Sequence, residues 1–252
     1  MDVADAALLA TAGFVGGGVN AVAGGGSLIV FPALVATGYG TLVANVTNSV
    51  ALWPGYLGGV LGFRRELAGQ GARVGALSVA AAVGSAAGCA LLLSTPPSAF
   101  DVVVPFLVLF ASLLLAAQPR VARLVGQPTG DHRDAARVLY PAVALAAVYG
   151  GYFGGALGVI LLGTLALTVH DTLRRLNALK GALSLVVATV TVLAFGVFGP
   201  VDWAAVGVVA PTSLLGGFAG ARVARRLNDR VLRWCVVGLG IVVAVALLVR
   251  SR

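Results

Sequence analysis

The sequence has 252 residues, of which 59% are hydrophobic and only 10% are charged, and its net charge is +8. Ordinary soluble domains carry about 25% charged residues, so this composition excludes a soluble globular protein and requires a lipid bilayer as solvent. The basic residues lie between apolar runs, a pattern typical of membrane topology, and this argues against nucleic-acid binding.

The apolar segments are best taken in chain order. A segment needs roughly 20 apolar residues to cross about 30 Å of hydrocarbon. The N-terminus, Met1 to Asp5, is acidic and lacks the basic region of a cleaved secretory signal. Six segments each fit one crossing: 42–62, 74–93, 101–118, 177–198, 203–221 and 231–249. Residues 6–38 and 138–169 are too long for one crossing and are interrupted by glycine, the first at 23–27 and the second around 150–151 and 154–155.

These two glycine-broken segments predict helical hairpins. Glycine costs a helix about 1 kcal/mol per residue relative to alanine, so clusters of this density interrupt it. Non-helical backbone at membrane depth persists only where protein or a water-filled cavity surrounds it. We therefore expect each segment to form two short helical arms joined by an unwound tip.

The charge distribution favours the hairpin model. Arginines concentrate in the loops 63–73, 119–137, 170–176 and 222–230, whereas the loops 39–41, 94–100 and 199–202 are poor in positive charge. If each broken segment enters and leaves on one side, every basic loop lies in the cytoplasm. If each crosses once, loops 119–137 and 170–176 fall on opposite sides. The sequence thus predicts a multi-pass protein of the inner membrane.

A shift of 132 residues aligns the two halves of the chain. Gly18 then falls on Gly150, Gly26 on Gly158, Asn45 on Asn177 and Asn48 on Lys180. Each half consists of one hairpin and three spans, in opposite orientations. The predicted fold is therefore an all-α polytopic membrane protein with two inverted repeats, residues 1–118 and 138–252, joined by a cytoplasmic linker, 119–137. Such repeats with broken helices are typical of secondary transporters, whose sites lie near mid-membrane.

Polar residues inside the spans point to an anion. No carboxylate lies deep in any span, and Lys180 is the only lysine of the chain. Unwound tips expose peptide N–H groups, which bind anions. The predicted substrate-binding residues are Asn20, Gly24, Gly25, Gly26, Ser27, Asn45, Thr47, Asn48, Asn177 and Lys180.

Structural alternatives remain open for these residues. The glycines can simply permit close helix packing, the asparagines can bridge helices, and Ser27 can cap the second arm of its hairpin. Lys180 can extend along its helix to the cytoplasmic interface. Cys89 and Cys235 lie inside apolar spans without a metal-binding spacing, and no catalytic motif is present, so we expect neither a metal, a cofactor nor an enzyme. A membrane assembly protein without a transported ligand is the rival interpretation.

Several motifs resemble one known family. The run from Gly17 to Leu34, with Asn20 and the Ala-Gly-Gly-Gly-Ser of 23–27, the segment Ala44 to Asn48, and Pro54 to Gly59 are similar to the first half of TauE/SafE sulfite exporters. Residues 149–154, 176–180 and 216–222 are similar to the second half. The resemblance implies a bacterial inner-membrane permease that exports sulfite, sulfoacetate or another organosulfonate by alternating access.

The same resemblance implies which segments line the site. They are 20–27, 45–48 and 177–180, and the expected partners are a small anion and the lipid bilayer, with a homodimer as a further candidate assembly. An importer or a channel for a small anion in the same fold is the alternative.

Overall fold

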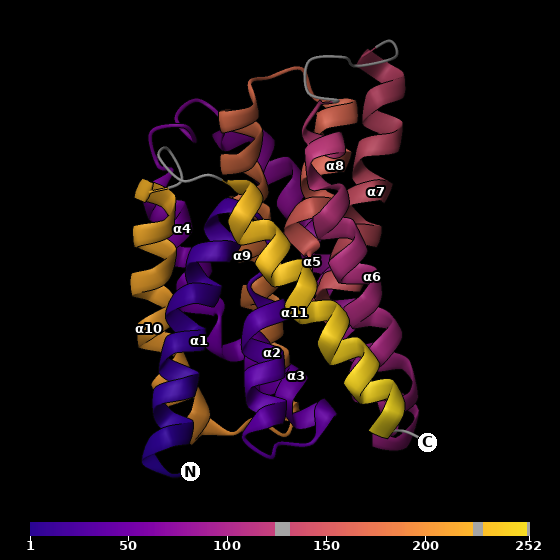
Figure 1. The fold of residues 1–252 in the computed structure, drawn as a ribbon. Coiled ribbons are helices and arrows are strands. Elements are labelled where there is room, and N and C mark those ends of the chain that lie inside the picture. Colours follow the sequence, from indigo (N-terminus) through magenta and orange to yellow (C-terminus); the bar gives the residue numbers. More distant parts are fainter. Residues whose placement is uncertain (124–131, 224–228, 251–252) are drawn as a thin grey trace.

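The computed structural model describes residues 1–123, 132–223 and 229–250, and within these ranges all regular secondary structure is helical (Figure 1). The helices are α1 (Val3–Val22), α2 (Ser27–Ala36), α3 (Thr41–Ala51), α4 (Trp53–Gly62), α5 (Gly71–Leu93), α6 (Pro97–Arg123), α7 (His132–Tyr152), α8 (Leu157–Thr168), α9 (Leu173–Phe198), α10 (Trp203–Val223) and α11 (Asp229–Arg250). The all-α prediction is confirmed for this part of the chain.

Within the described ranges, five helices are long and apolar enough to cross a membrane: α1, α5, α6, α9 and α10. Their number and hydropathy confirm a multi-pass membrane protein. The expectation of two short arms in each glycine-broken segment is wrong for the first arm. Helices α1 and α7 have 20 and 21 residues, whereas α2 and α8 have 10 and 12. An aspartate capping box formed by Asp2 and Asp5 starts α1.

Both predicted breaks are present, and left-handed backbone makes them. Gly24 has φ +80° between α1 and α2, and Gly154 has φ +76° between α7 and α8. Glycine reaches this region without the steric cost that a Cβ imposes. Ala156, also in the second break, has φ +57°. Gly150 and Gly151 lie within α7, so the second break falls only at the later of its two predicted positions.

A third break lies where Trp53-Pro54-Gly55 predicts a kink. Residues 42–62, predicted as one crossing, form α3 and α4, which meet at Leu52. Pro54 lies at the start of α4 and has no N–H to bond the carbonyl one turn earlier, which favours a helix boundary here. The predicted linker 119–137 is helical at both ends, since α6 extends to Arg123 and α7 begins at His132. Residues 124–131 and 224–228, in two of the predicted basic loops, lie outside the described part of the chain.

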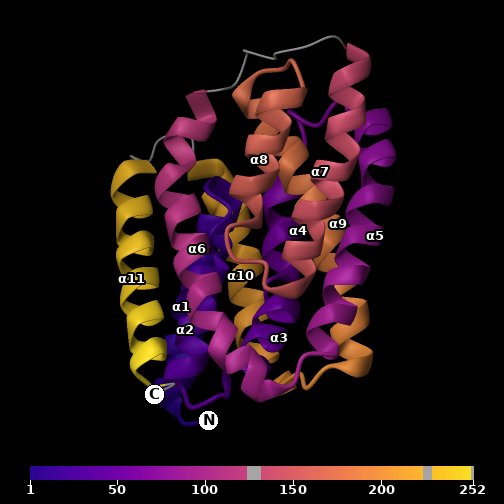
Figure 2. The same cartoon turned by 90° about the vertical axis from the view of Figure 1, so that its right-hand side faces the viewer.

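The path of the chain brings both termini to one end of the molecule, the lower end in Figures 1 and 2. The turns α2–α3, α5–α6 and α9–α10 lie at this end. The connections 63–70 and 169–172, which overlap the predicted basic loops 63–73 and 170–176, lie at the other. Helix α1 rises from the lower end and α2 returns to it, whereas α7 and α8 leave from and return to the upper end (Figure 1). The described basic loops therefore share one end.

Glycine contacts bind two helix pairs closely. A Cβ on Gly220 of α10 would lie 2.6 Å from Gly18 Cα of α1, and a Cβ on Gly88 of α5 would lie 2.9 Å from Tyr152 N of α7. Small residues let backbones approach, which is the main source of helix association where lipid removes the hydrophobic driving force. Helix α1 thus packs tightly on α10, and α7 on α5.

One aspartate joins the loops at the basic end. Asp171 forms ion pairs with Arg73 (3.1 Å) and Arg175 (3.0 Å) and accepts a hydrogen bond from Thr172 N–H (2.8 Å). Burial alone would raise the pKa of Asp171, but the hydrogen bonds from Thr172, Arg175 and Arg73 outweigh it and hold the pKa below its ordinary value of 3.8. Asp171 therefore stabilises the fold as a carboxylate, linking the start of α5 to the start of α9.

We predict that Asp171→Asn lowers the free energy of unfolding at pH 7 by about 1 kcal/mol, the range for partly exposed ion pairs. Because the folded-state pKa is depressed, the stabilisation is complete well above pH 3.8 and is lost as the pH falls through the folded-state pKa. Thermal unfolding of detergent-purified protein at several pH values measures the difference from wild type. A difference that stays constant from pH 7 to pH 3 would contradict this role.

Candidate functional site

The two breaks meet inside the molecule. A Cβ on Gly24 would lie 2.6 Å from Gly158 Cα, and one on Gly158 would lie 2.7 Å from Gly24 Cα. The side chain of Lys180 passes the same point, with its Cδ 3.3 Å from that second Cβ position. The tip of the α1–α2 segment, the start of α8 and the stem of Lys180 therefore form one junction that leaves no room for a side chain.

Asn20 closes the first tip. Its Oδ1 accepts a hydrogen bond from Gly26 N–H (2.7 Å), and its side chain is buried. The N–H groups of Ala23 and Gly24 donate to the carbonyl of Val19. These three tip amides are therefore paired within the protein. Side chains supply further donors near the junction. Asn20 Nδ2 is one of them, because it is buried without a hydrogen-bond partner.

Lys180 is buried in the protein with its charge unpaired. It is the eighth residue of α9, 2% exposed, and its Nζ has no hydrogen-bond partner. Within the described ranges the ion pairs are those of Asp171 with Arg73 and Arg175, and neither involves Lys180. The alternative that Lys180 extends to the interface is wrong, since α9 begins at Leu173 and places Lys180 two turns inside the helix.

A small cavity surrounds these donors. Its lining is Asn20, Ala21, Gly55, Tyr56, Gly59, Val60, Phe63, Asn177, Ala178, Lys180, Gly181 and Ser184, and we call it the lysine cavity. Three of its polar atoms are buried and unpaired: Asn20 Nδ2, Lys180 Nζ and Ser184 Oγ. All three can donate a hydrogen bond, and none of the lining residues is a carboxylate. Its volume of about 20 Å³ holds roughly one water molecule.

A second cavity of about 20 Å³ adjoins the first, and we call it the serine cavity. Its lining is Ser27, Ser49, Leu52, Tyr56, Gly150, Gly154, Leu157, Ser184, Val187, Ala188 and Thr191. Tyr56 and Ser184 line both cavities. Tyr56 is therefore part of the partition between two polar compartments.

Other predicted site residues have structural contacts instead. Asn45 Nδ2 donates to Tyr152 O (3.0 Å), and Asn177 Nδ2 donates to Ala21 O (3.5 Å), so both bridge helices. Thr47 Oγ1 accepts from Asp202 N–H (3.0 Å) and holds the turn between α9 and α10. Of these three residues, Asn177 alone lines the lysine cavity.

The remaining predicted residues divide between the tip and α3. Gly25 packs against the side chain of Leu115, and Gly26 lies against Gly16 O of α1. Ser27 is the first residue of α2 rather than its cap, and it lines the serine cavity. Asn48 is buried with both side-chain amide atoms unpaired, and it lines neither cavity. The structure thus brings together Asn20, Asn177 and Lys180 in one cavity, with Gly24 at their junction.

Sequence analysis did not select Ser184 or Tyr56. Ser184 follows Asn177 and Lys180 at positions i+7 and i+4 on α9, so the three share one face. Thr191 continues this face by another seven residues into the serine cavity. Helical spacing counted from the only lysine could have identified this polar stripe.

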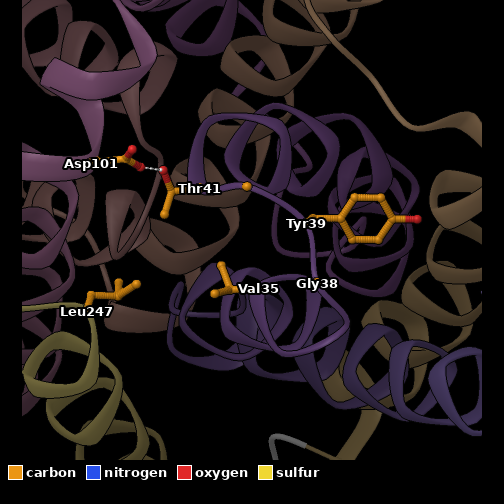
Figure 3. A pocket seen from close by; sticks show the side chains of 7 residues that line it. Val35, Gly38, Tyr39, Thr41, Asp101 and Leu247 are labelled. Atoms are coloured by element: carbon orange, nitrogen blue, oxygen red, sulfur yellow. Dashed lines mark hydrogen bonds between the residues drawn. The ribbon is translucent and has the colours of Figure 1, made fainter. Parts of the chain in front are cut away.

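A larger cavity of about 330 Å³ lies at the end that holds the termini (Figure 3). There the Thr41 hydroxyl donates to the carboxylate of Asp101, while the Tyr39 ring points away from this pair (Figure 3). Asp101 is the charged residue of this lining, so the cavity does not suit an anion. Among the described residues, no three His, Cys, Asp or Glu side chains group as metal ligands.

Comparison with known proteins identifies the family of this chain. The family model described as sulfite exporter TauE/SafE matches residues 9–247. This chain belongs to the TauE/SafE family. A "probable membrane transporter protein" of Haemophilus influenzae is 30% identical over 241 residues, covering 92% of this chain and 89% of that protein.

A second relative, the "probable membrane transporter protein ORF9" of a Sinorhizobium species, is 24% identical over 256 residues, covering 96% of this chain and 92% of that protein. No solved structure matches. Family membership and these relatives support a membrane transporter, and the resemblance noted in the motifs is confirmed.

We predict that Gly24→Ala destabilises this TauE/SafE protein by about 2 kcal/mol or more, because alanine strains φ +80° and overlaps Gly158. Gly75→Ala is the matched control, since Gly75 lies in α5 with nothing within 4 Å of its added Cβ. Alanine there favours the helix by up to about 1 kcal/mol. Equal melting temperatures of the two variants in detergent would show that the tip contact is dispensable.

Proposed function

We propose that this transporter carries a small anion across the membrane by alternating access, and that Lys180 in the lysine cavity is the principal binding group. The observation that supports this is a buried ammonium group without a carboxylate partner. Burying a charge at membrane depth costs several kcal/mol unless a counter-charge pairs with it. A bound anion supplies that counter-charge.

The donors around Lys180 suit an oxyanion. Asn20 Nδ2 and Ser184 Oγ are unpaired and line the same cavity. A sulfite or sulfonate group has three oxygen atoms that accept hydrogen bonds, one for each donor. A metal cation or an ammonium substrate would find no carboxylate in this lining. We infer sulfite, sulfoacetate or another organosulfonate as the substrate, and outward transport, in line with the description of the family as sulfite exporters.

Reciprocal contacts support two inverted repeats. Asn45 is the fifth residue of α3 and bonds the last residue of α7, Tyr152. Asn177 is the fifth residue of α9 and bonds Ala21, in the last turn of α1. Each asparagine thus satisfies a carbonyl at the helix end of the other half, where helices leave such groups unpaired. The 132-residue shift that pairs Asn45 with Asn177 also pairs Gly84 with Gly216 and Gly88 with Gly220, the glycines by which α5 packs on α7 and α10 on α1.

The closed cavities favour a carrier over an open channel. Each compartment holds roughly one water molecule, and Tyr56 lines both, so an anion passes only if the surrounding helices move. Tyr56 follows the break at Leu52, where α3 ends and α4 begins. Helix ends absorb changes in backbone angle at low cost, so this break can serve as the hinge that moves Tyr56. The hydroxyl of Ser184, shared by both cavities, would accompany the anion.

We expect Lys180→Ala to weaken anion binding about 10- to 100-fold, the value of one charge-assisted hydrogen bond, and to abolish transport. Thermal-shift screening of purified protein against sulfite, organosulfonates and carboxylates identifies the ligand first. Proteoliposome flux of that ligand then compares Lys180→Ala with Arg174→Ala, a basic residue exposed on the same helix. Normal flux in folded Lys180→Ala protein would exclude the assigned site.

The Tyr56 partition leads to a separate prediction. Tyr56→Ala joins the two cavities and should increase passive leak of the anion, whereas Tyr56→Phe keeps the ring and loses only the hydroxyl group. Leak is measured as efflux of the ligand from preloaded proteoliposomes without a driving gradient. Size-exclusion profiles verify folding. If Tyr56→Ala leaks no faster than Tyr56→Phe, Tyr56 is not the barrier.

A further inference from the structure

A basic cavity lies between the upper ends of α4 and α10, away from the transport site. Its lining is Leu61, Gly62, Arg64, Arg65, Phe218, Ala221 and Arg222, and its volume is about 420 Å³. It is far larger than the lysine cavity, which α4 lines with Gly59 and Phe63. We call it the arginine cavity.

The arginine cavity concentrates positive charge without visible neutralisation. Arg64, Arg65 and Arg222 are exposed, and none forms an ion pair with a residue that the structure describes. The guanidinium carbon of Arg222 lies 3.6 Å from the centre of the Phe218 ring, within the range of a cation–π interaction. Planar guanidinium groups bind phosphate oxygens in pairs, so the arrangement suits a phosphate group.

The rest of the lining is apolar and opens toward lipid. Leu61 is 49% exposed, and Leu215, seven residues before Arg222 on α10, is 61% exposed. Exposed leucines on helices of a membrane protein contact acyl chains. Arginines above an apolar surface at the end of two packed helices match a phospholipid, with its headgroup at the arginines and its chain along the leucines.

The cavity is separate from the substrate route. Leu61 lies two residues from both Gly59 and Phe63, about 200° around the helix from each. Gly59 and Phe63 line the lysine cavity, and the two cavities share no lining residue. A ligand held there reaches membrane lipid more directly than it reaches Lys180.

We propose that the arginine cavity binds the phosphate headgroup of an anionic phospholipid in the leaflet at the basic end of the molecule. The bound lipid bridges Arg64 or Arg65, which follow α4, and Arg222 of α10. It strengthens the packing of these two helices, where a Cβ on Gly217 of α10 would overlap Gly55 O of α4. A basic pocket between membrane helices on the positively charged side is a recurrent headgroup site. This inference does not depend on the transported substrate.

The test is native mass spectrometry of the full chain in detergent, titrated with phosphatidylglycerol and, separately, with phosphatidylcholine. Phosphatidylglycerol is expected to bind preferentially to wild type. Arg222→Gln and Arg64→Gln should each weaken its binding about fivefold, the value of one basic residue near an anionic headgroup. Arg174→Gln is the matched control, because it removes the same charge at the same end outside the cavity and should leave binding unchanged.

Three outcomes would overturn the proposal. Equal binding of both lipids would show that the cavity does not select an anionic headgroup. If Arg174→Gln weakens phosphatidylglycerol binding as much as Arg222→Gln does, the binding depends on general surface charge rather than on the cavity. If inorganic phosphate alone raises the melting temperature of wild type but not of Arg222→Gln, and phosphatidylglycerol adds nothing, the ligand is a free anion rather than a lipid.

Discussion

The fold depends on one backbone contact between the break after α1 and the start of α8. Gly24 and Gly158 meet with no side chain between them, deep among the helices. Lipid offers no hydrogen bonds to an unwound backbone, so this segment persists only because protein encloses it and Asn20 and Val19 pair its amides. A methyl group at either glycine would separate the tips, and the stem of Lys180, which passes the same point, would lose its position.

Some polar groups of the spans bond to other parts of the protein, and others are unpaired. Asn45 Nδ2, Asn177 Nδ2 and Thr47 Oγ1 form hydrogen bonds to helix ends and a turn, although Asn45 Oδ1 is buried and unpaired. Asn20 Nδ2, Lys180 Nζ and Ser184 Oγ remain unpaired around one cavity. Because unpaired buried donors are costly, their convergence favours a ligand-binding function, and their shared donor character selects a negatively charged ligand.

The closely packed helix pairs and the two cavities occupy different parts of the molecule. Glycines bind α1 to α10 and α5 to α7 with backbones in contact, which makes these pairs resistant to distortion. The two cavities lie instead where α4 and α9 face each other, near the break at Leu52 and beside Tyr56. A carrier needs rigid groups of helices with a deformable region between them. In this protein the deformable region carries the unpaired polar groups.

Composition alone determined that this protein lives in a membrane, because so few charges cannot cover a chain of 252 residues in water. Local sequence also determined the helix breaks at Gly24 and Gly154 and marked Asn20 and Lys180, since glycine clusters and intramembrane charge are costly wherever the chain runs. Only the tertiary structure decided that three tip amides are already paired, that Tyr56 and Ser184 separate two cavities, and that Asn48 lies outside both. These features depend on the register between helices distant in sequence, which side-chain packing sets and local propensity does not encode.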